Sequence, residues 1–159
     1  GSVAQGLAFG SNLPTIALSG LANMAQQAFD ETSADICWSA IDARMQEIYF
    51  GVFYRDEQGI AQPLNAEQVI SPVNVNLSEL VVLSEDREVV AIGSGWAAYP
   101  DELNLEAVKV NSIEDKFPKA SSGLQQAVVC LQQEQVLPPA ELQPVYLRNQ
   151  VAKKKGEQK

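Results

Sequence analysis

The residues best suited to chemistry lie in the segment IDARMQEIYFGVFYRDEQG, which covers residues 41–59. Asp42 ends an apolar run and Arg44 follows it closely, a position where a carboxylate could bind a metal or help to hold a phosphate. A working site of that kind needs a second converging carboxylate, or glycines that let the backbone approach an anion. Ala43 and Arg44 follow instead, so a turn-capping Asp or an Asp-Arg surface pair is favoured over catalysis.

Gly93 and Gly95 mark a second candidate, in the sequence Gly-Ser-Gly-Trp that follows an apolar run. A glycine-containing turn between a strand and a helix is a position where a nucleotide could bind. The spacing matches neither the P-loop nor the Rossmann glycine pattern, so a tight turn that lets Trp96 pack is favoured. The alternative is a nucleotide-binding enzyme that uses Asp42 together with the Gly93–Gly95 turn.

The composition excludes several kinds of active site. The 159 residues include no His, which removes Ser-His-Asp catalysis, Cys-His catalysis and the HExxH zinc site. Cys37 and Cys130 have no metal-binding spacing, and a reduced cytoplasmic setting is expected. The net charge of -9 opposes a broad phosphate-binding face, and no apolar run is long enough to span a membrane. We therefore expect no metal, no cofactor, no membrane and no direct RNA contact.

The hydrophobic pattern predicts the elements that position these residues. Strands are expected over 14–18, 36–41, 47–55, 60–69, 88–92 and 108–110. Helices are expected over 3–9 and 19–29, from Ser71-Pro72, briefly after Trp96, and over 121–135. From residue 35 the order is strand, strand, strand, helix, strand, helix, strand, helix. This is the element order of the ribonuclease-H-like fold, an α/β architecture with a mixed sheet flanked by helices.

The same pattern predicts which faces are buried. Residues 36–41 are nearly all apolar, as in a strand covered on both faces, whereas 47–55 alternates like a strand covered on one face. Gly59 closes a hairpin, and Pro63 places the next strand at a sheet edge. The buried stripe of the helix over 19–29 is expected at Leu21, Met24, Ala25 and Ala28. That of the last helix is expected at Leu124, Ala127, Val128 and Leu131.

Four stretches, taken in order, resemble the bacterial TsaB (YeaZ) family. They are VAQGLAFGSNLPTIALSGLANMAQ (3–26), IDARMQEIYFGVFYRDEQG (41–59), IGSGWAAYPD (92–101) and QPVYLRNQVAKKK (143–155). The resemblance implies the actin-like ATPase (ASKHA) superfamily, whose members have two ribonuclease-H-like lobes. It implies a remnant of the N-terminal lobe and the interlobe connection over 1–33. A C-terminal ribonuclease-H-like lobe over 34–150 and a disordered basic tail over 151–159 follow. Most of the N-terminal lobe of the family is expected to be missing from this chain.

The resemblance also implies a function. The family works with TsaD and TsaE to install a threonylcarbamoyl group on adenosine 37 of tRNAs that read ANN codons, and TsaD carries the catalytic and metal site. The chain is then a non-catalytic scaffold subunit, and tRNA is reached only through the complex. In this family Asp42, Gly93 and Gly95 correspond to a degenerate nucleotide site.

The resemblance implies a partner interface at the start of the chain. Val3, Ala4, Leu7 and Ala8 lie in the helix that resembles the end of the family's interface region, which binds TsaD or forms a homodimer. The four-residue spacing of Ala4 and Ala8 gives this helix a small-residue face that another helix can approach closely. Spacing alone leaves packing within the chain equally open.

Overall fold

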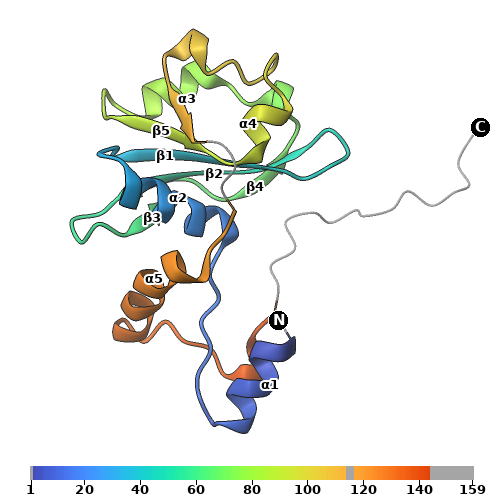
Figure 1. Cartoon of the computed structure of the whole chain (residues 1–159), viewed down its shortest axis with the longest axis vertical. Coiled ribbons are helices and arrows are strands. Elements are labelled where there is room, and N and C mark those ends of the chain that lie inside the picture. Colours follow the sequence, from blue (N-terminus) through green and yellow to red (C-terminus); the bar gives the residue numbers. More distant parts are fainter. Residues whose placement is uncertain (1, 114–116, 144–159) are drawn as a thin grey trace, which may run out of the picture.

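A computed structural model describes residues 2–113 and 117–143, and these form a mixed α/β structure (Figure 1). The strands are β1 (Ile36–Asp42), β2 (Ile48–Arg55), β3 (Ala61–Pro63), β4 (Gln68–Ile70), β5 (Val89–Ile92) and β6 (Asn111–Ile113). The helices are α1 (Ser2–Gly10), α2 (Gly20–Glu31), α3 (Leu77–Leu83), α4 (Ser94–Ala98) and α5 (Ala120–Gln132). Short 3₁₀ turns lie at η1 (Pro72–Asn74), η2 (Glu106–Val108) and η3 (Pro139–Glu141). The predicted basic tail at 151–159 lies outside the described residues.

The strands form one sheet in the order β3-β2-β1-β5-β6, with β4 also paired to β2. β1 runs antiparallel to β2, with Cys37 opposite Phe53, and parallel to β5, with Cys37 opposite Val90. β6 continues the parallel half beside β5. The predicted meander followed by βα units is therefore confirmed, and Pro63 lies in the edge strand β3 as expected.

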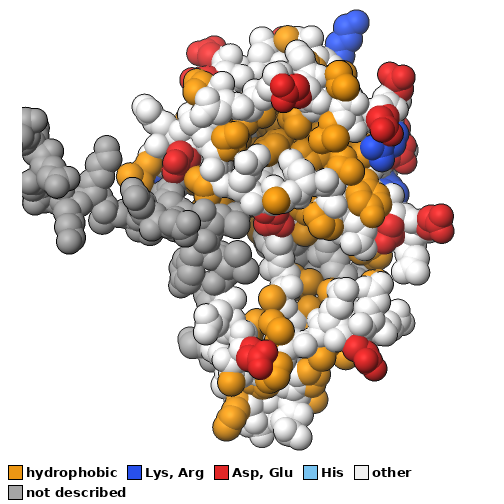
Figure 2. All heavy atoms as spheres, turned by 180° about the vertical axis from the view of Figure 1, so that it is seen from behind, with side chains coloured by type: hydrophobic (Ala, Val, Ile, Leu, Met, Phe, Trp, Pro, Cys, Tyr) orange, Lys and Arg blue, Asp and Glu red, His pale blue; other side chains and the backbone are white. Residues whose placement is uncertain are grey.

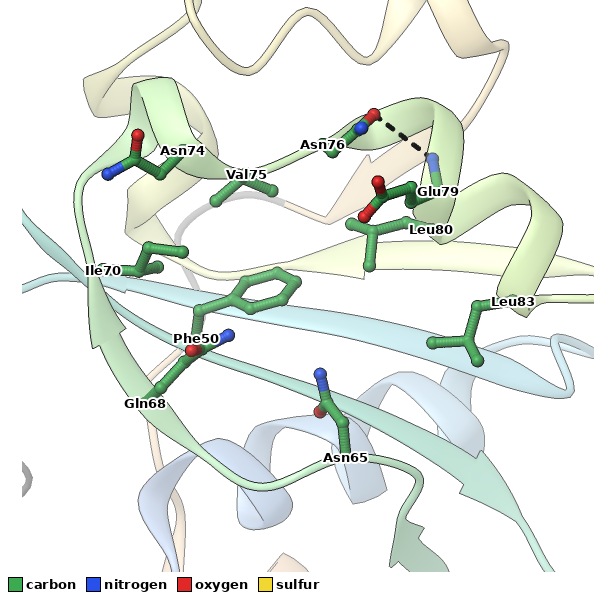
Figure 3. A pocket seen from close by; sticks show the side chains of 10 residues that line it. All are labelled: Phe50, Asn65, Gln68, Ile70, Asn74, Val75, Asn76, Glu79, Leu80 and Leu83. Atoms are coloured by element: carbon green, nitrogen blue, oxygen red, sulfur yellow. Dashed lines mark hydrogen bonds between the residues drawn. The ribbon is translucent and has the colours of Figure 1, made fainter.

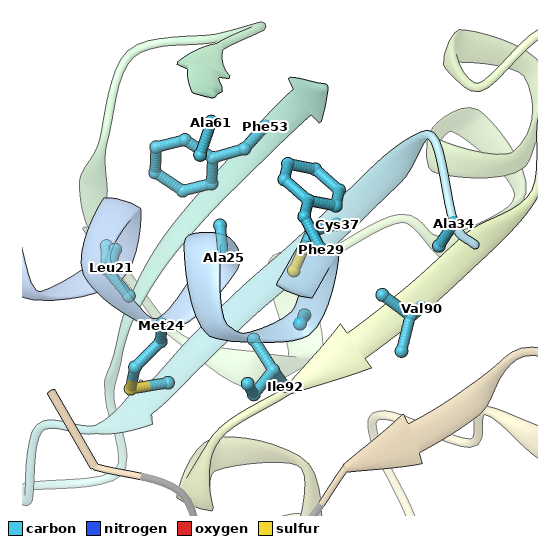
Figure 4. Close-up of a cluster of buried hydrophobic side chains, with 11 residues drawn as sticks. Leu21, Met24, Ala25, Phe29, Ala34, Cys37, Phe53, Ala61, Val90 and Ile92 are labelled. Atoms are coloured by element: carbon cyan, nitrogen blue, oxygen red, sulfur yellow. The ribbon is translucent and has the colours of Figure 1, made fainter. Parts of the chain in front are cut away.

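Helix α2 covers one face of the sheet (Figure 4). The hydroxyl of Ser19 accepts hydrogen bonds from the amides of Leu21 (3.1 Å) and Ala22 (3.3 Å), which confirms the predicted start of this helix. The predicted stripe is buried, and Phe29 extends it onto β1 and β5. Because each fully buried large apolar side chain contributes about 1.5–3 kcal/mol, this stripe fixes α2 on the sheet.

Helices α3 and α4 cover the opposite face (Figure 1). There Trp38 of β1 and Trp96 of α4 pack with their ring centroids 6.3 Å apart. The indole of Trp96 donates a hydrogen bond of 3.1 Å to the carbonyl of Ile92, so the large ring is buried without an unsatisfied N–H. The expectation that β2 is covered on one face is wrong. Phe50 packs on this side and Phe53 on the α2 side, because apolar residues occupy both faces of the strand.

Three predicted elements differ in the structure. Residues 14–18 form no strand, and Thr15 makes a single bridge to Leu137. The predicted strand 60–69 is split into β3 and β4, because the side-chain carbonyl of Asn65 accepts the hydrogen bond of the Val52 amide at 2.8 Å and takes the place of a ladder partner. The expected strand at 108–110 is also wrong. Residue 108 ends η2, Lys109 turns the chain with a φ of 57°, and β6 begins later, at Asn111.

The helix expected from Ser71-Pro72 consists of two short pieces. The 3₁₀ turn η1 comes first, and α3 begins only after Asn76, whose side-chain oxygen accepts a hydrogen bond from the amide of Glu79 at 3.3 Å. This internal cap interrupts the helical spacing, so Val73 and Val81 are exposed and Leu80 is buried. The apolar spacing predicted the presence of a helix here, but not its start.

Helix α5 faces opposite to the prediction. Leu124, Val128 and Leu131 are 65%, 52% and 56% exposed, whereas Gly123 and Gln126 face α2. A Cβ on Gly123 would lie 3.0 Å from the side chain of Leu18, so glycine permits the close approach of the two segments. The close contact at Gly123 thus turns this side of α5 toward α2, and hydrophobic side chains remain exposed over the lower part of the molecule (Figure 2).

Candidate functional site

Asp42 and the turn after β5 meet at one edge of the sheet. The amide of Asp42 donates a hydrogen bond of 3.1 Å to the hydroxyl of Ser94, which begins α4. They are brought together because β1 and β5 are parallel neighbours, whose carboxyl ends lie at the same edge. In open α/β sheets this edge is where ligands bind. The structure therefore joins the two positions that the sequence marked as candidates.

The carboxylate of Asp42 is hydrogen-bonded within the chain. Its Oδ1 accepts a hydrogen bond from the Arg44 amide at 3.0 Å, which confirms the interpretation of Asp42 as a turn-capping residue. The same oxygen accepts a hydrogen bond from the phenol of Tyr99 at 3.2 Å. Burial, this hydrogen bond and the negative charges of Asp42 and Glu102 together raise the pKa of Tyr99. Tyr99 is therefore a protonated donor at neutral pH, and it joins α4 to the β1–β2 turn.

Gly93 and Gly95 are required by packing. Gly93 has a φ of 107°, and a Cβ there would collide with the backbone carbonyl of Ala40. A Cβ on Gly95 would lie 2.9 Å from the Cβ of Ala40. Both glycines therefore allow α4 to start against β1, a close approach that accounts for them without a bound nucleotide.

The β1–β2 turn has an unusual backbone. Arg44, Met45 and Gln46 have φ values of 61°, 57° and 59°, so three successive non-glycine residues adopt the left-handed conformation. Each such residue costs roughly 1–2 kcal/mol relative to the right-handed conformation. The other described non-glycine residues with positive φ are Asn12, Glu85, Asp86, Lys109 and Glu134, and all of them follow the end of a helix or 3₁₀ turn. A left-handed residue is ordinary after a helix, but a run of three in a hairpin is not.

The predicted interface residues lie far from Asp42. Helix α1 is at the end of the molecule remote from the sheet (Figure 1), and its Gln5 side chain donates hydrogen bonds to the carbonyls of Pro139 (2.7 Å) and Leu142 (2.9 Å). Val3, Ala4 and Leu7 are exposed, whereas Ala8 is 9% exposed and faces inward. The structure therefore places two separate candidate surfaces on the chain and does not bring them together.

An open hollow of about 330 Å³ lies between α3 and the β3–β4 connection (Figure 3). Phe50, Ile70 and Leu80 supply its apolar side, while Asn65 and Glu79 are among the polar residues around it. Glu79 is the single charged residue in the lining. The hollow therefore provides a concave surface with side-chain amide groups. Its lining residues include no pair of side chains that could carry out acid-base or nucleophilic chemistry.

Sequence reasoning missed Ser94 and Tyr99 as partners of Asp42. Tyr99 is separated from Asp42 by 57 residues, and no spacing in the sequence links them. Only a prediction that β1 and β5 pair in parallel could have indicated that α4 lies at this edge. Within residues 2–113 and 117–143, no group of three His, Cys, Asp or Glu side chains could hold a metal ion. No helix in these ranges has the length and apolarity that a membrane span requires.

Known relatives match most of the chain. Over 96% of its length it is 37% identical to the tRNA threonylcarbamoyladenosine biosynthesis protein TsaB of Escherichia coli (strain K12). It is 34% identical, again over 96% of its length, to the protein of that name from Haemophilus influenzae. The chain spans 65% and 64% of these relatives. No family model matches the chain.

Solved structures agree with the sequence comparison. YeaZ from Pseudomonas aeruginosa superposes with a TM-score of 0.77 at 29% identity, covering 91% of this chain and 65% of that one. A second Pseudomonas aeruginosa structure, described as an uncharacterized protein with similarity to peptidase YEAZ, gives the same TM-score and identity over 92% of this chain. The predicted ribonuclease-H-like lobe of the actin-like superfamily is thereby confirmed. In sequence and in fold, most of this chain is thus similar to proteins of the TsaB (YeaZ) family.

Proposed function

We propose that the chain acts in threonylcarbamoyladenosine biosynthesis on tRNA, as a non-catalytic subunit that works with TsaD and TsaE. The observation that carries the proposal is the 37% identity to Escherichia coli TsaB over 96% of the chain. In this proposal TsaD transfers the threonylcarbamoyl group to adenosine 37 of ANN-reading tRNAs. The chain contributes a protein surface, requires no cofactor and reaches tRNA only through the complex.

The geometry around Asp42 supports a non-catalytic role. Its Oδ1 accepts hydrogen bonds from the Arg44 amide and the Tyr99 phenol, so groups of the same chain satisfy it. Gly93 and Gly95 serve the contact with Ala40. The net charge of -9 also opposes direct binding of a polyanion such as tRNA.

Helix α1 is the proposed surface for TsaD, and a homodimer would use the same surface. Val3 and Leu7 are 76% and 70% exposed and lie four residues apart, on one side of the helix with Ala4 between them in sequence. Ala8 is on the inner side, so its contribution is to hold α1 in place. Exposed apolar side chains beside small residues are suited to close contact with a partner helix.

A calorimetric binding measurement tests this proposal. Tagged TsaD is mixed with the chain, and binding is quantified by calorimetry for the wild type, for Ala4→Asp and for the control Ala107→Asp, an exposed position on η2. We expect Ala4→Asp to weaken binding at least 10-fold, because a charge would be buried in an apolar contact. Ala107→Asp should bind like the wild type. Wild-type chain that fails to bind TsaD would contradict the function, whereas unchanged binding of Ala4→Asp would contradict the α1 interface alone.

The second candidate function is a nucleotide-binding enzyme. It is favoured by one observation, the meeting of Asp42 with the Gly93–Gly95 turn at the carboxyl ends of parallel strands. A thermal-shift titration with ATP and magnesium separates it from the first. We expect no shift. Saturable stabilisation that disappears in Asp42→Ala would support the enzyme and count against the scaffold.

A peptidase role is not proposed for this chain. The comparison with peptidase YEAZ describes the Pseudomonas protein. The absence of His from this sequence removes the usual base of serine and cysteine peptidases and the usual zinc ligands.

A further inference from the structure

The open hollow between α3 and the β3–β4 connection has an apolar floor (Figure 3). Phe50 of β2 and Leu80 of α3 form this floor and are 2% and 8% exposed, and Ile70 of β4 packs against the same cluster. The volume of about 330 Å³ is at the small end of the range of ligand pockets, about 300–1,000 Å³. The hollow is therefore suited to a small ligand with an apolar group that packs on this floor.

The side chain of Asn65 offers a fixed donor to the hollow. Its Oδ1 accepts the hydrogen bond of the Val52 amide at 2.8 Å, and the Leu64 amide donates to the Val52 carbonyl at 2.8 Å, so β2 holds this segment. Figure 3 shows the amino nitrogen of Asn65 on the side of the hollow. Within residues 2–113 and 117–143 this amino group donates no hydrogen bond. It therefore favours a ligand with a hydrogen-bond acceptor, such as a carbonyl oxygen.

Glu79 adds a negative charge at the rim of the hollow. It is the single charged residue in the lining, and its side chain is exposed. Its carboxylate forms no ion pair with any residue that the structure describes. Its backbone amide donates to the side chain of Asn76 at 3.3 Å, which holds Glu79 in the first turn of α3. The carboxylate favours a cation, and the net charge of -9 further disfavours an anion.

Three kinds of ligand group can be compared with this lining. An alkylammonium group, as in a lysine side chain, would pair with Glu79 but leave the amino group of Asn65 without an acceptor. A carboxylate would accept from Asn65 but be repelled by Glu79. An α-amino amide carries a protonated amine and a carbonyl group on neighbouring carbon atoms, with a side chain on the first of them. It provides the acceptor, the positive charge and the apolar group together.

We propose that the hollow binds the N-terminal residue of a peptide chain whose first side chain is apolar. The α-ammonium group pairs with the carboxylate of Glu79, and the first carbonyl oxygen accepts a hydrogen bond from Nδ2 of Asn65. The side chain packs on Phe50 and Leu80. Capture of a peptide terminus by fixed polar groups is a recurring mode of recognition. The lining shares no residue with α1 or with the contacts of Asp42, so this proposal is independent of the proposed function.

Leucinamide is the probe, in an NMR titration of the isotope-labelled 159-residue chain. It carries the amine, the carbonyl oxygen and an apolar side chain. We expect saturable shifts of the amides of residues 65–70 and 76–83, with a Kd of about 1 mM. N-acetylleucinamide lacks the positive charge and should bind about 3-fold more weakly. Free leucine brings a carboxylate close to Glu79 and should also bind more weakly than leucinamide.

Two pairs of variants test the lining. Glu79→Gln keeps the size of the side chain and should weaken leucinamide binding about 3-fold, as for an exposed charge pair. Its control is Glu57→Gln, which removes an equal charge from the β2–β3 turn outside the hollow and should bind like the wild type. Leu83→Trp fills the hollow and should abolish the shifts. Its control is Val82→Trp, at an exposed position of α3 outside the lining, and thermal melting checks that each variant is folded.

Each outcome decides the proposal. Saturable local shifts that Glu79→Gln weakens and Leu83→Trp abolishes support it. Shifts that do not saturate by about 20 mM probe, or that persist in folded Leu83→Trp, overturn it. Equal binding of leucinamide and N-acetylleucinamide would show that the hollow recognises only an apolar group, and tighter binding of free leucine would assign it to a free amino acid. Either result makes the peptide N-terminus wrong, and none of them changes the expected binding of TsaD.

Discussion

The phenol of Tyr99 donates a hydrogen bond to Oδ1 of Asp42 at 3.2 Å, although 57 residues separate them in the sequence. This contact joins the end of α4 to the turn after β1. The same oxygen accepts a hydrogen bond from the Arg44 amide, so the contact also ties α4 to the turn whose residues 44–46 have positive φ values. One pair of side chains thus connects helix α4 to the edge of the sheet where Asp42 lies.

Tyr99 should titrate above an ordinary tyrosine. Burial comes first among the causes, followed by the Asp42 hydrogen bond and the charges of Asp42 and Glu102, and together they raise its pKa. The folded state therefore favours the protonated phenol, so its stabilising effect is present below the unfolded pKa of about 10 and is lost as pH rises through the folded pKa.

Absorbance titration of tyrosinate measures this effect. Asp42→Ala should lower the Tyr99 pKa, and Tyr99→Phe should remove the same transition, which identifies it among the four tyrosines. A titration curve that Asp42→Ala leaves unmoved would contradict the contact.

Gly95→Ala should destabilise the chain by about 1–3 kcal/mol, because the new Cβ would lie 2.9–3.2 Å from atoms of Ala40 and push α4 from β1. The matched control is Gly6→Ala in α1, where no atom lies within 4 Å of the added Cβ. That change should stabilise by about 0.5–1 kcal/mol through helix propensity. Guanidinium unfolding measures both. Equal effects of the two substitutions would show that α4 does not start against β1 as described.

Asp56 should stabilise the β2–β3 turn at neutral pH and lose this effect in acid. Burial alone would raise its pKa, but hydrogen bonds from the Ile60 amide, the Gln62 side chain and the Gln58 amide outweigh it and lower the pKa. A carboxylate with a lowered folded pKa contributes stability above the unfolded pKa of about 4, and this is lost as pH falls through the folded pKa.

Asp56→Ala should therefore cost about 1 kcal/mol at pH 7 and nothing at a pH below the folded pKa. Urea midpoints across this pH range provide the measurement. The neighbouring exposed carboxylate, in Glu57→Ala, is the control and should change little. A pH-independent difference for Asp56→Ala would assign the effect to turn geometry and not to the charge.

Leu124→Ser in α5 should change the free energy of unfolding by less than about 0.5 kcal/mol, because this side chain is 65% exposed. Leu21→Ala in α2, where the side chain is 3% exposed, should cost about 2–5 kcal/mol. Denaturant unfolding of the pair decides which face of α5 is inward. A large loss for Leu124→Ser would mean that the apolar stripe is covered in solution.

The sequence predicted α2 and the central strands well because several signals agreed there. The Ser19 cap, the apolar stripe of α2 and the continuous apolar run of β1 all specify the same local structure. The prediction failed for α5 because an apolar stripe shows that a helix has two different faces. It does not show which of these faces packs against the neighbouring element. The close approach at Gly123 decided that question, and it depends on Leu18, about a hundred residues away.

The candidate site was predictable only in part. That Asp42 caps a turn follows from local residue chemistry, and the Arg44 amide confirms it. The bonds to Ser94 and Tyr99 depend on the parallel pairing of β1 and β5, which brings distant segments to one edge. The left-handed run at residues 44–46 had no signal at all, since Arg, Met and Gln do not favour that conformation.

The positions of the two tryptophans determine what the intrinsic fluorescence of this protein reports. Trp38 and Trp96 are the two tryptophans of the chain, and both lie on the sheet face that α3 and α4 cover. The face under α2 contains Phe29 and Phe53 but no indole among the buried residues of its cluster. Intrinsic fluorescence therefore reports on one half of the core. If α2 detached from the sheet while α4 stayed in place, the fluorescence spectrum would remain that of the folded chain.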